Sequence, residues 1–503
     1  MRAPKISKSF ARFIAIRALM ALLLFMTLAA WSMGSAVGSS PDEDYVLTSI
    51  WCGTEGNPPH CRKDPTNDQA MIVPELVGMP SLCYFMAGPS KSARCQAESY
   101  DNDQLMPTEA YNKGLYPFRY FNIVRNFVEY DVAGSVIKVR LFNSAIAAVL
   151  ILAVASLTRN RLNSTLLALF SISSPVAFYF IASVNTSSWG VTSVIGFTLA
   201  SIVIVQNFRN TKIFFPALFF ALISVFLAVS ARKETKYILL VLGAMVIAGR
   251  LYKLESKSSK TAIFFSLSAI TFMLVATSKE IRTFGPFSAL TKNLIIDEFG
   301  NDSQSLIIQN VFDLPIAFLG FFGFWGLGKF EVELPSIVWL LVVINFTLIV
   351  RFTFKNLNRN LRIFGYGAFG LIALIILEFT QQSQREIDTF IQPRYLLPFF
   401  LGIIIFLTSN LKIKLPNTLT AKITLMAVVA NSVALRTTLR RYTSGLEIDL
   451  AKSLNNYSEW WWQFGPSPEQ VWLIGTFAFA ALLVLLEFEK SREAVRQEIG
   501  DSD

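Results

Sequence analysis

Three consecutive carboxylates, Asp42, Glu43 and Asp44, follow an apolar run that ends near Val37. Like charges held this close raise one another's pKa, so the cluster is costly to keep together. At the outer face of a membrane protein such a cluster can act as a general base or hold a divalent cation. We expect Asp42 to be the base, with Glu43 and Asp44 adjusting its pKa or binding the cation. A solvated acidic helix cap is the alternative that these residues alone leave open.

A second group of residues is suited to bind an anion. Arg232 and Lys233 lie on a connection that the charge pattern places outside, against the tendency of basic residues to lie inside. Arg394 and Tyr395 lie on another outer connection. A guanidinium fork fits a phosphate, so we expect these four residues to bind a substrate phosphate. Anchoring to lipid headgroups is the alternative for each arginine. Arg140, near the start of the second span, is either a further phosphate contact or a side chain that reaches the headgroups.

All four cysteines, Cys52, Cys61, Cys83 and Cys95, lie in one hydrophilic segment. Thiols gathered in one exposed loop are typical of disulfides in an oxidising compartment. The simplest of the three connectivities pairs Cys52 with Cys61 and Cys83 with Cys95. A structural zinc is the alternative, but no CxxC spacing is present and the single histidine, His60, adds little. The segment is therefore predicted to lie outside the cytoplasm with two disulfides.

The composition indicates a membrane protein. Of 503 residues, 53% are hydrophobic and 44 are Phe, and the mean hydropathy is +0.47. Apolar runs of membrane-spanning length recur along the chain. The net charge of +10 comes from Lys and Arg in short connections between these runs, so the expected partner is a lipid bilayer and not a nucleic acid.

The chain is predicted to have five regions. A basic cytoplasmic amino terminus (1–17) precedes the first transmembrane helix (18–38), which we expect to be retained, although a cleaved signal peptide is the alternative. An exterior loop (39–131) carries the acidic motif and both disulfides, with turns, short helices and little regular sheet. A polytopic transmembrane domain (132–487) and a cytoplasmic tail (488–503) follow.

The fold is predicted to be all-α, with about twelve transmembrane helices. After the first, spans are expected near Ile137–Leu157, Thr165–Ser183, Trp189–Gln206, Ile213–Val229, Tyr237–Ala248, Thr261–Ala276, Pro335–Val350, Ile363–Phe379, Tyr395–Leu407, Ala421–Leu435 and Glu469–Glu487. Asp313 and Pro315 interrupt the run Leu306–Gly328, which favours a re-entrant segment, with a thirteenth span as the alternative. Both chain ends and the basic connection Arg351–Arg362 are then cytoplasmic.

Aromatic residues cluster on the predicted exterior side. Tyr116–Phe121 and Arg125–Tyr130 are predicted to lie at the membrane surface with aromatic rings facing lipid. The run Trp460–Trp462 is interpreted as an interfacial aromatic belt, and a platform that stacks on sugars is the alternative.

The motifs of soluble enzymes are absent from the sequence. It contains no P-loop, no dinucleotide-binding glycine pattern after a strand and no HExxH motif. The remaining residues suit a lipid-phosphate-linked sugar, which already carries a good leaving group. Such a reaction needs a carboxylate to accept the proton of the acceptor and arginines to bind the phosphate.

Several segments, in this order, resemble one bacterial family. They are SPDEDYVLTSIWC after the first span, SPVAFYFIASVNTSSWG, the Ala231-Arg232 pair, GFWGLGKFEVELP, PRYLLPFF and LRRYTSGLE. The family is that of predicted membrane proteins known as domain of unknown function 2142. The resemblance extends from about Ala18 to Glu487.

That family is similar to the GT-C class of polytopic glycosyltransferases, which place an acidic motif in the first exterior loop. By this likeness Asp42 matches the first acidic position and Glu43 follows it. Two positions depart from the pattern: Val46 stands where a histidine is expected, and Gly328-Lys329 stands where an acidic residue is expected. These departures bear on any metal site, and a divalent cation at the acidic motif is the one cofactor that the resemblance suggests.

The resemblance implies transfer of a sugar from a polyprenyl-phosphate donor to a glycan or lipid acceptor at the cell surface, as in polysaccharide biosynthesis. A transporter or flippase of a lipid-linked saccharide is one alternative. A non-catalytic protein of cell-envelope assembly is another. Ion-coupled transport would favour carboxylates inside the spans, where Asp313 and Glu378 are almost alone.

Overall fold

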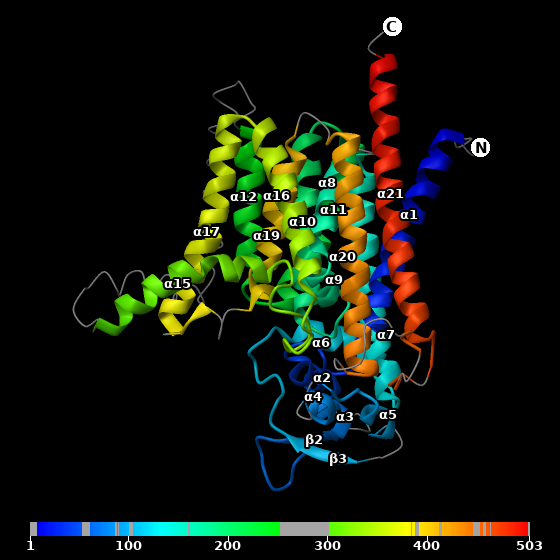
Figure 1. Cartoon of the computed structure of the whole chain (residues 1–503), viewed down its shortest axis with the longest axis vertical. Coiled ribbons are helices and arrows are strands. Elements are labelled where there is room, and N and C mark those ends of the chain that lie inside the picture. The colour runs from blue at the N-terminus through cyan, green and yellow to red at the C-terminus, as the bar shows by residue number, and fades with distance from the viewer. Residues whose placement is uncertain are drawn as a thin grey trace.

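The computed structural model describes residues 8–52, 61–85, 88, 90–99, 104–158, 161–251, 301–383, 385–387, 392–411, 415–445, 453–455, 459–462 and 464–500. Eight helices in these ranges are long and apolar enough to cross a membrane. They are α1 (Lys8–Met33), α7 (Val132–Ser156), α10 (Thr186–Gln206), α11 (Thr211–Ala231), α16 (Ser336–Asn356), α17 (Arg359–Ser383), α20 (Asn417–Thr443) and α21 (Pro468–Gly500). They form a helical bundle (Figure 1).

Shorter helices complete the bundle: α8 (Asn163–Ser173), α9 (Val176–Ile181), α12 (Thr235–Leu251) and α19 (Leu397–Ser409). The segment Thr165–Ser183, predicted as one span, is divided into α8 and α9, because α8 ends before Pro175, whose ring and missing N–H interrupt the helix. The predicted span Thr261–Ala276 lies outside the described residues. Eight long apolar helices therefore stand in the described ranges where about twelve spans were predicted.

Helix α10 is the most enclosed of the long helices. It packs against α7, α11, α12 and α19. Gly196 permits the close approach, since a Cβ there would lie 2.7 Å from both the Leu150 and the Ser224 side chains. Small residues allow membrane helices to approach in this way. The packing fixes the start of α10 next to the end of α11.

Helix α15 (Asn301–Gly320) runs across the direction of the bundle helices (Figure 1). It occupies most of the described part of the run Leu306–Gly328, and its apolar part is shorter than the eight long spans. This orientation agrees with the prediction that the run does not cross. It leads into a hairpin turn, closed by backbone hydrogen bonds between Leu327 and Val332 of 3.0 and 3.2 Å.

The cysteine-rich segment between α1 and α7 forms a separate layer at one end of the bundle (Figure 1). It contains α2 (Glu43–Cys52), β1 (Arg62–Lys63), β2 (Met71–Pro74), α3 (Glu75–Gly78), α4 (Leu82–Phe85), α5 (Cys95–Ser99), β3 (Leu105–Thr108), α6 (Phe118–Val124) and the 3-10 turn η1 (Arg125–Phe127). The strands form one antiparallel sheet in the order β1-β2-β3. The structure is mostly helical, as predicted, and this small sheet is its addition to the predicted all-α fold. The structure contains the disulfides Cys52–Cys61 and Cys83–Cys95, the pairing that the sequence favoured.

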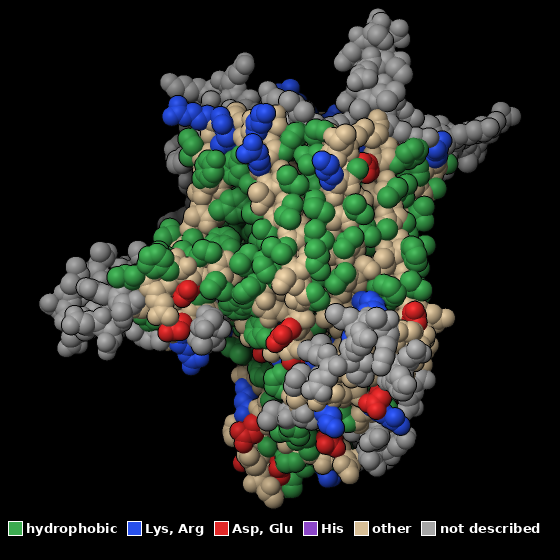
Figure 2. All heavy atoms as spheres, viewed as in Figure 1, with side chains coloured by type: hydrophobic (Ala, Val, Ile, Leu, Met, Phe, Trp, Pro, Cys, Tyr) green, Lys and Arg blue, Asp and Glu red, His purple; other side chains and the backbone are tan. Residues whose placement is uncertain are grey.

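Charge and hydropathy are distributed along the bundle axis. Hydrophobic side chains cover the middle of the bundle, and basic side chains gather at the end opposite the cysteine-rich segment (Figure 2). The start of α1, the end of α21 and the α16–α17 connection lie at that end (Figure 1). The helix ends on either side of this connection carry Arg351 and Lys355 in α16, and Arg359 and Arg362 in α17.

Two predictions about exposed aromatic residues are wrong in part, although Phe118 and Tyr130 are exposed as predicted. Tyr120 and Phe121 of α6 are buried, as are Trp461 and Trp462. The indole N–H of Trp462 donates to the Met33 carbonyl at the end of α1 (3.0 Å). These rings pack inside the protein, so Trp461 and Trp462 form neither a lipid-facing belt nor a surface for stacking sugars.

Candidate functional site

The turn between α1 and α2 presents the acidic cluster. The Ser40 N–H donates to the Glu43 carboxylate (2.9 Å), and the Glu43 N–H donates to the Ser40 carbonyl (3.0 Å). Asp42 has a φ of +62°, a left-handed conformation that Asp adopts more readily than most residues. The turn sends neighbouring carboxylates in different directions: the Asp42 side chain is 41% exposed and that of Glu43 is 0% exposed.

Two distant elements hold the backbone just before Asp42. The Pro41 carbonyl accepts a hydrogen bond from the Asn185 amide (2.6 Å), which precedes α10. It accepts a second from Arg394 Nη1 (2.9 Å), in the 3-10 turn η2 (Pro393–Tyr395). Asn185 also caps α10, since its side chain accepts from the Ser187 N–H (2.8 Å). The position of Asp42 is therefore set by the start of α10 and by η2.

Asp42 forms an ion pair with Arg394. Arg394 Nη2 lies 2.7 Å from the Asp42 carboxylate, and the Arg394 side chain is 1% exposed against 41% for Asp42. Arg394 Nη2 also donates to the Tyr395 hydroxyl (3.2 Å). The buried Nε of Arg394 has no hydrogen-bond partner among the described residues. The buried Arg394 guanidinium is thus paired with the Asp42 carboxylate, which solvent can reach.

Arg232 lies next to this pair, at the end of α11. Its Cζ is 4.8 Å from the centre of the Tyr395 ring, and the Cζ of Arg394 is 5.1 Å from the same ring centre. Arg232 Nη1 donates to the Ser187 hydroxyl (2.9 Å), and its Nε lies 2.6 Å from the Glu234 carboxylate. The structure thus brings together Arg232, Arg394 and Tyr395, as the sequence predicted. Lys233 does not join them, because its side chain is exposed and lies 3.4 Å from the Gly114 carbonyl.

Tyr116 belongs to the same group and was not predicted as a site residue. The Cζ of Arg232 lies 5.4 Å from the centre of its ring. Burial raises the pKa of Tyr116 to about 12, although the positive charge of Arg232 opposes this shift. Tyr116 therefore stays protonated at neutral pH and can donate a hydrogen bond. Its segment was interpreted only as a surface helix, and nothing in its local pattern distinguishes this tyrosine.

Glu43 and Arg140 form a buried structural pair. Arg140 Nη2 lies 2.9 Å from the Glu43 carboxylate, and both side chains are 0% exposed. The Arg140 guanidinium also donates to the carbonyls of Ser32, Ser35 and Ala36 at 2.7–2.9 Å. It thereby satisfies carbonyl groups that the end of α1 leaves unpaired. Arg140 is therefore neither a phosphate contact nor a residue that reaches the headgroups, and the carboxylate of Glu43 faces away from solvent.

Asp44 has a third, separate partner. Its carboxylate lies 3.2 Å from Nζ of Lys329, which also donates to the Ser81 hydroxyl (2.9 Å). Asp42, Glu43 and Asp44 therefore point to three different basic side chains. They do not converge as a ligand set, and the described residues contain no group of three or more His, Cys, Asp or Glu placed to hold a metal. The three carboxylates therefore do not fit a divalent cation.

Glu331 is a further carboxylate that sequence analysis did not single out. It lies in the hairpin turn before α16 and accepts a hydrogen bond from the Tyr442 hydroxyl (2.7 Å). Its other oxygen is buried without a hydrogen-bond partner in the described part of the chain. Burial raises the pKa of Glu331, although the Tyr442 hydrogen bond and the charge of Arg441 oppose this. In the sequence Glu331 lies two residues after Lys329. It is therefore close to the position where the family resemblance led us to expect an acidic residue and where Gly328-Lys329 stands instead.

The raised pKa of Glu331 predicts a pH-dependent stability. The folded carboxyl holds its proton more tightly than the unfolded one, whose pKa is 4.5. The stabilisation is therefore complete below pH 4.5 and is lost as the pH rises through the folded pKa. Glu331→Gln stays neutral, so its apparent Tm in detergent should fall less than that of the native protein over this pH range. Equal pH slopes for the two proteins would contradict the assignment.

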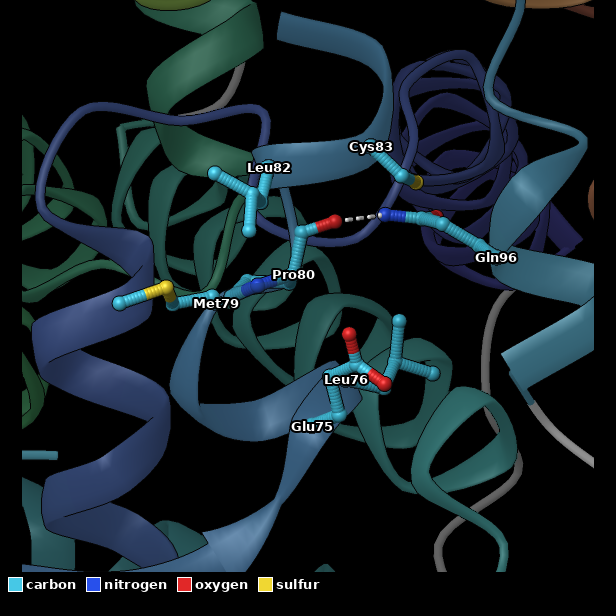
Figure 3. Close-up of a pocket in the computed structure, with 7 residues that line it drawn as sticks. All are labelled: Glu75, Leu76, Met79, Pro80, Leu82, Cys83 and Gln96. Atoms are coloured by element: carbon cyan, nitrogen blue, oxygen red, sulfur yellow. Dashed lines mark hydrogen bonds between the residues drawn. The ribbon is translucent and has the colours of Figure 1, made fainter. Parts of the chain in front are cut away.

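A small pocket of about 70 Å³ lies inside the cysteine-rich segment. Figure 3 shows its lining, which includes Glu75, Pro80, Cys83 and Gln96. The Gln96 amide donates to the Pro80 carbonyl (2.6 Å) and to the Val37 carbonyl (2.7 Å). Ligand pockets usually enclose about 300–1,000 Å³, so this space is too small for a sugar. The Gln96 bonds connect the segment to the end of α1 and do not mark a substrate site.

Comparison with known proteins gives one match. A family model described as "Predicted membrane protein (DUF2142)" matches residues 24–403. Neither the search of curated proteins nor the search of solved structures finds a match. The matched range contains Asp42, Arg140, Arg232 and Glu331, and Arg394 lies near its end.

Proposed function

The chain belongs to the DUF2142 family of predicted membrane proteins, and from this premise we propose that it is a membrane glycosyltransferase. Its donor would be a sugar linked to a polyprenyl phosphate, and its acceptor a surface glycan or lipid. The observation that supports this proposal is the half-exposed Asp42 carboxylate, held in front of the buried guanidinium of Arg394 with Arg232 beside it. The likeness to GT-C enzymes remains a prediction.

The charges explain how the site would accept a phosphate. Both arginines of the site are paired with a carboxylate that is partly open to solvent: Arg394 with Asp42, and Arg232 with Glu234, whose side chain is 36% exposed. An incoming phosphate can replace Asp42 at the Arg394 fork, because a guanidinium binds either anion with the same geometry. Asp42 is then released from its ion pair next to the reacting carbon. Tyr116 and Tyr395 offer hydroxyl groups to the phosphate.

The proposed step requires one base and no acid. The acceptor hydroxyl loses its proton to Asp42 while its oxygen bonds to the anomeric carbon of the sugar. The bond from that carbon to the phosphate oxygen breaks, and its electron pair leaves with the phosphate. Arg394 and Arg232 stabilise the charge that develops on this leaving group.

The proposed orientation places the site on the exterior face of a bacterial plasma membrane, with both chain ends in the cytoplasm. Two observations support it. The disulfides lie in the layer at the site's end of the bundle, and disulfides persist in oxidising compartments. Basic side chains gather at the opposite end, as is typical of cytoplasmic connections (Figure 2).

A double-mutant cycle tests the phosphate site. Arg232→Lys and Arg394→Lys each keep the positive charge but lose the planar fork, so each should weaken binding of a polyprenyl phosphate while the fold survives. Because both arginines are expected to contact one ligand, their effects should couple by about 0.5–3 kcal/mol. Lys233→Ala is the matched control and should leave binding unchanged.

Binding in detergent and cleavage of a synthetic polyprenyl-phosphate sugar should be measured for the same variants. Strictly additive effects on binding would show that the arginines are separate anchors. Movement of the intact lipid-linked sugar across a vesicle membrane without cleavage would favour the flippase. An absence of both binding and cleavage in the native protein would favour an assembly protein.

A further inference from the structure

We infer that α15 lies in the plane of the bilayer, with its exposed face in the acyl chains of the leaflet next to the cysteine-rich segment. The partner of this face is the membrane lipid itself. Three features of α15 support this position: which of its residues are exposed, which it turns toward the protein, and its direction relative to the bundle helices. None of them depends on the proposed enzyme activity.

The exposed face of α15 is apolar. Its exposed hydrophobic residues are Ile307 (43%), Ile308 (59%), Val311 (46%), Phe312 (77%) and Ile316 (37%). At about 100° per residue these positions fall on one half of the helix. Gln309, at the edge of this half, is the exposed polar residue among positions 307–316. A helix surrounded by water would present mainly polar residues on this side.

The buried face of α15 carries a polar residue instead. Asn310 is 1% exposed. Its amide donates to the Arg385 carbonyl (3.2 Å) and its oxygen accepts from the Ile387 N–H (3.1 Å). The helix also packs against α17 and against η2. The polar contact faces the protein and the apolar side faces outward, an arrangement that suits a lipid environment.

The position of α15 relative to the bundle favours membrane lipid as the partner of its exposed face. The helix runs across the bundle axis, near the level where the long helices give way to the cysteine-rich segment (Figure 1). Hydrophobic side chains there continue the apolar surface of the bundle, and charged side chains lie nearby on the side toward the cysteine-rich segment (Figure 2). Between positions 306 and 320 the helix itself carries one charged residue, Asp313. This combination is that of an interfacial helix, whose apolar face enters the bilayer by about 5–10 Å.

The contact between α15 and η2 links the position of α15 to the arginine site. Arg394 and Tyr395 lie on η2, so a helix anchored in the membrane surface holds the arginine site at the same level. An anion carried by a lipid could then reach Arg394 while its hydrocarbon tail stays in the bilayer.

Spin labels on single introduced cysteines test the inference. The four native cysteines are disulfide-bonded and can remain. Labels replacing Ile308, Phe312 and Ile316 should be examined in proteoliposomes for collision with oxygen, which concentrates in lipid, and with a water-soluble nickel complex. A label replacing Phe219 in α11 (60% exposed) is the lipid control, and one replacing Leu105 in β3 (51% exposed) is the water control.

All three α15 labels should behave like the label at position 219, with strong oxygen and weak nickel collisions, and should lie at nearly the same shallow depth. A helix that crosses the bilayer would instead change depth by about 6 Å for every four residues. Nickel access like that at position 105 would place α15 in water. Protection from both reagents would indicate a protein partner. Each of these three results would overturn the inference, and none requires a substrate, so the test is independent of the transferase proposal.

Discussion

Replacing Asp42 by Asn should lower the rate of sugar transfer by about 10²–10⁴-fold, the usual contribution of a general base. The amide keeps the size of the side chain but cannot accept the proton of the acceptor hydroxyl. The protein should stay folded, because the Asp42 side chain is 41% exposed. Binding of a polyprenyl phosphate should not weaken, since the substitution removes a carboxylate that competes for Arg394.

Asp44→Asn is the matched control for this experiment. Asp44 is also partly exposed and also paired with a basic residue, Lys329. It differs in that it does not contact Arg394. Release of polyprenyl phosphate from a synthetic donor should be close to native in this control. Equal losses in the two variants, or full activity of Asp42→Asn, would show that Asp42 is only an acidic cap.

Replacing Glu43 by Ala should lower the free energy of unfolding by about 3–5 kcal/mol, because it leaves the Arg140 guanidinium charged and unpaired in a buried position. The Ser40 N–H also loses its acceptor. Glu43→Gln keeps the shape and one acceptor oxygen, but its NH2 group then faces either the Ser40 N–H or the Arg140 guanidinium. Its loss should therefore be smaller than that of Glu43→Ala, but not zero. The free energy of unfolding of both variants can be measured by unfolding them in detergent mixtures of graded composition.

The Glu43 result separates two roles for neighbouring carboxylates. A Glu43→Ala protein with native stability but no transfer activity would contradict the structural role. It would restore the hypothesis that Glu43 adjusts the pKa of Asp42. Loss of stability in Glu43→Ala together with loss of activity alone in Asp42→Asn would assign the two residues to different tasks.

Local patterns in the sequence predicted much of the architecture. Length and apolarity identified the long helices, and the gathering of all four cysteines predicted the disulfides. Arg232 and Arg394, predicted to lie on outer connections, do lie together, whereas Lys233, the other exception to the charge pattern, does not join them. These features depend on the composition of short segments, or on the alternation of successive connections between the two faces of the membrane.

The roles within the acidic cluster depend on distant partners. Glu43 pairs with a residue 97 positions away, and Asp44 with one 285 positions away. No local pattern shows which of three adjacent carboxylates turns inward. Likewise, Trp462 is held by the end of α1 and Trp461 packs against Tyr442 of α20, and no property of the WWW run reveals either partner.

The capping of α1 by Arg140 has a consequence for synthesis of the protein. The last carbonyls of α1 emerge from the ribosome more than 100 residues before their hydrogen-bond donor, and the Pro41 carbonyl precedes Arg394 by 353 positions. Until α7 is inserted, the turn that carries Asp42 lacks the contacts that define it. Until η2 has been synthesised, Asp42 lacks its ion-pair partner, the guanidinium of Arg394. A nascent chain therefore carries an open acidic segment for most of its translation, and the site closes only when the last third of the chain reaches the membrane.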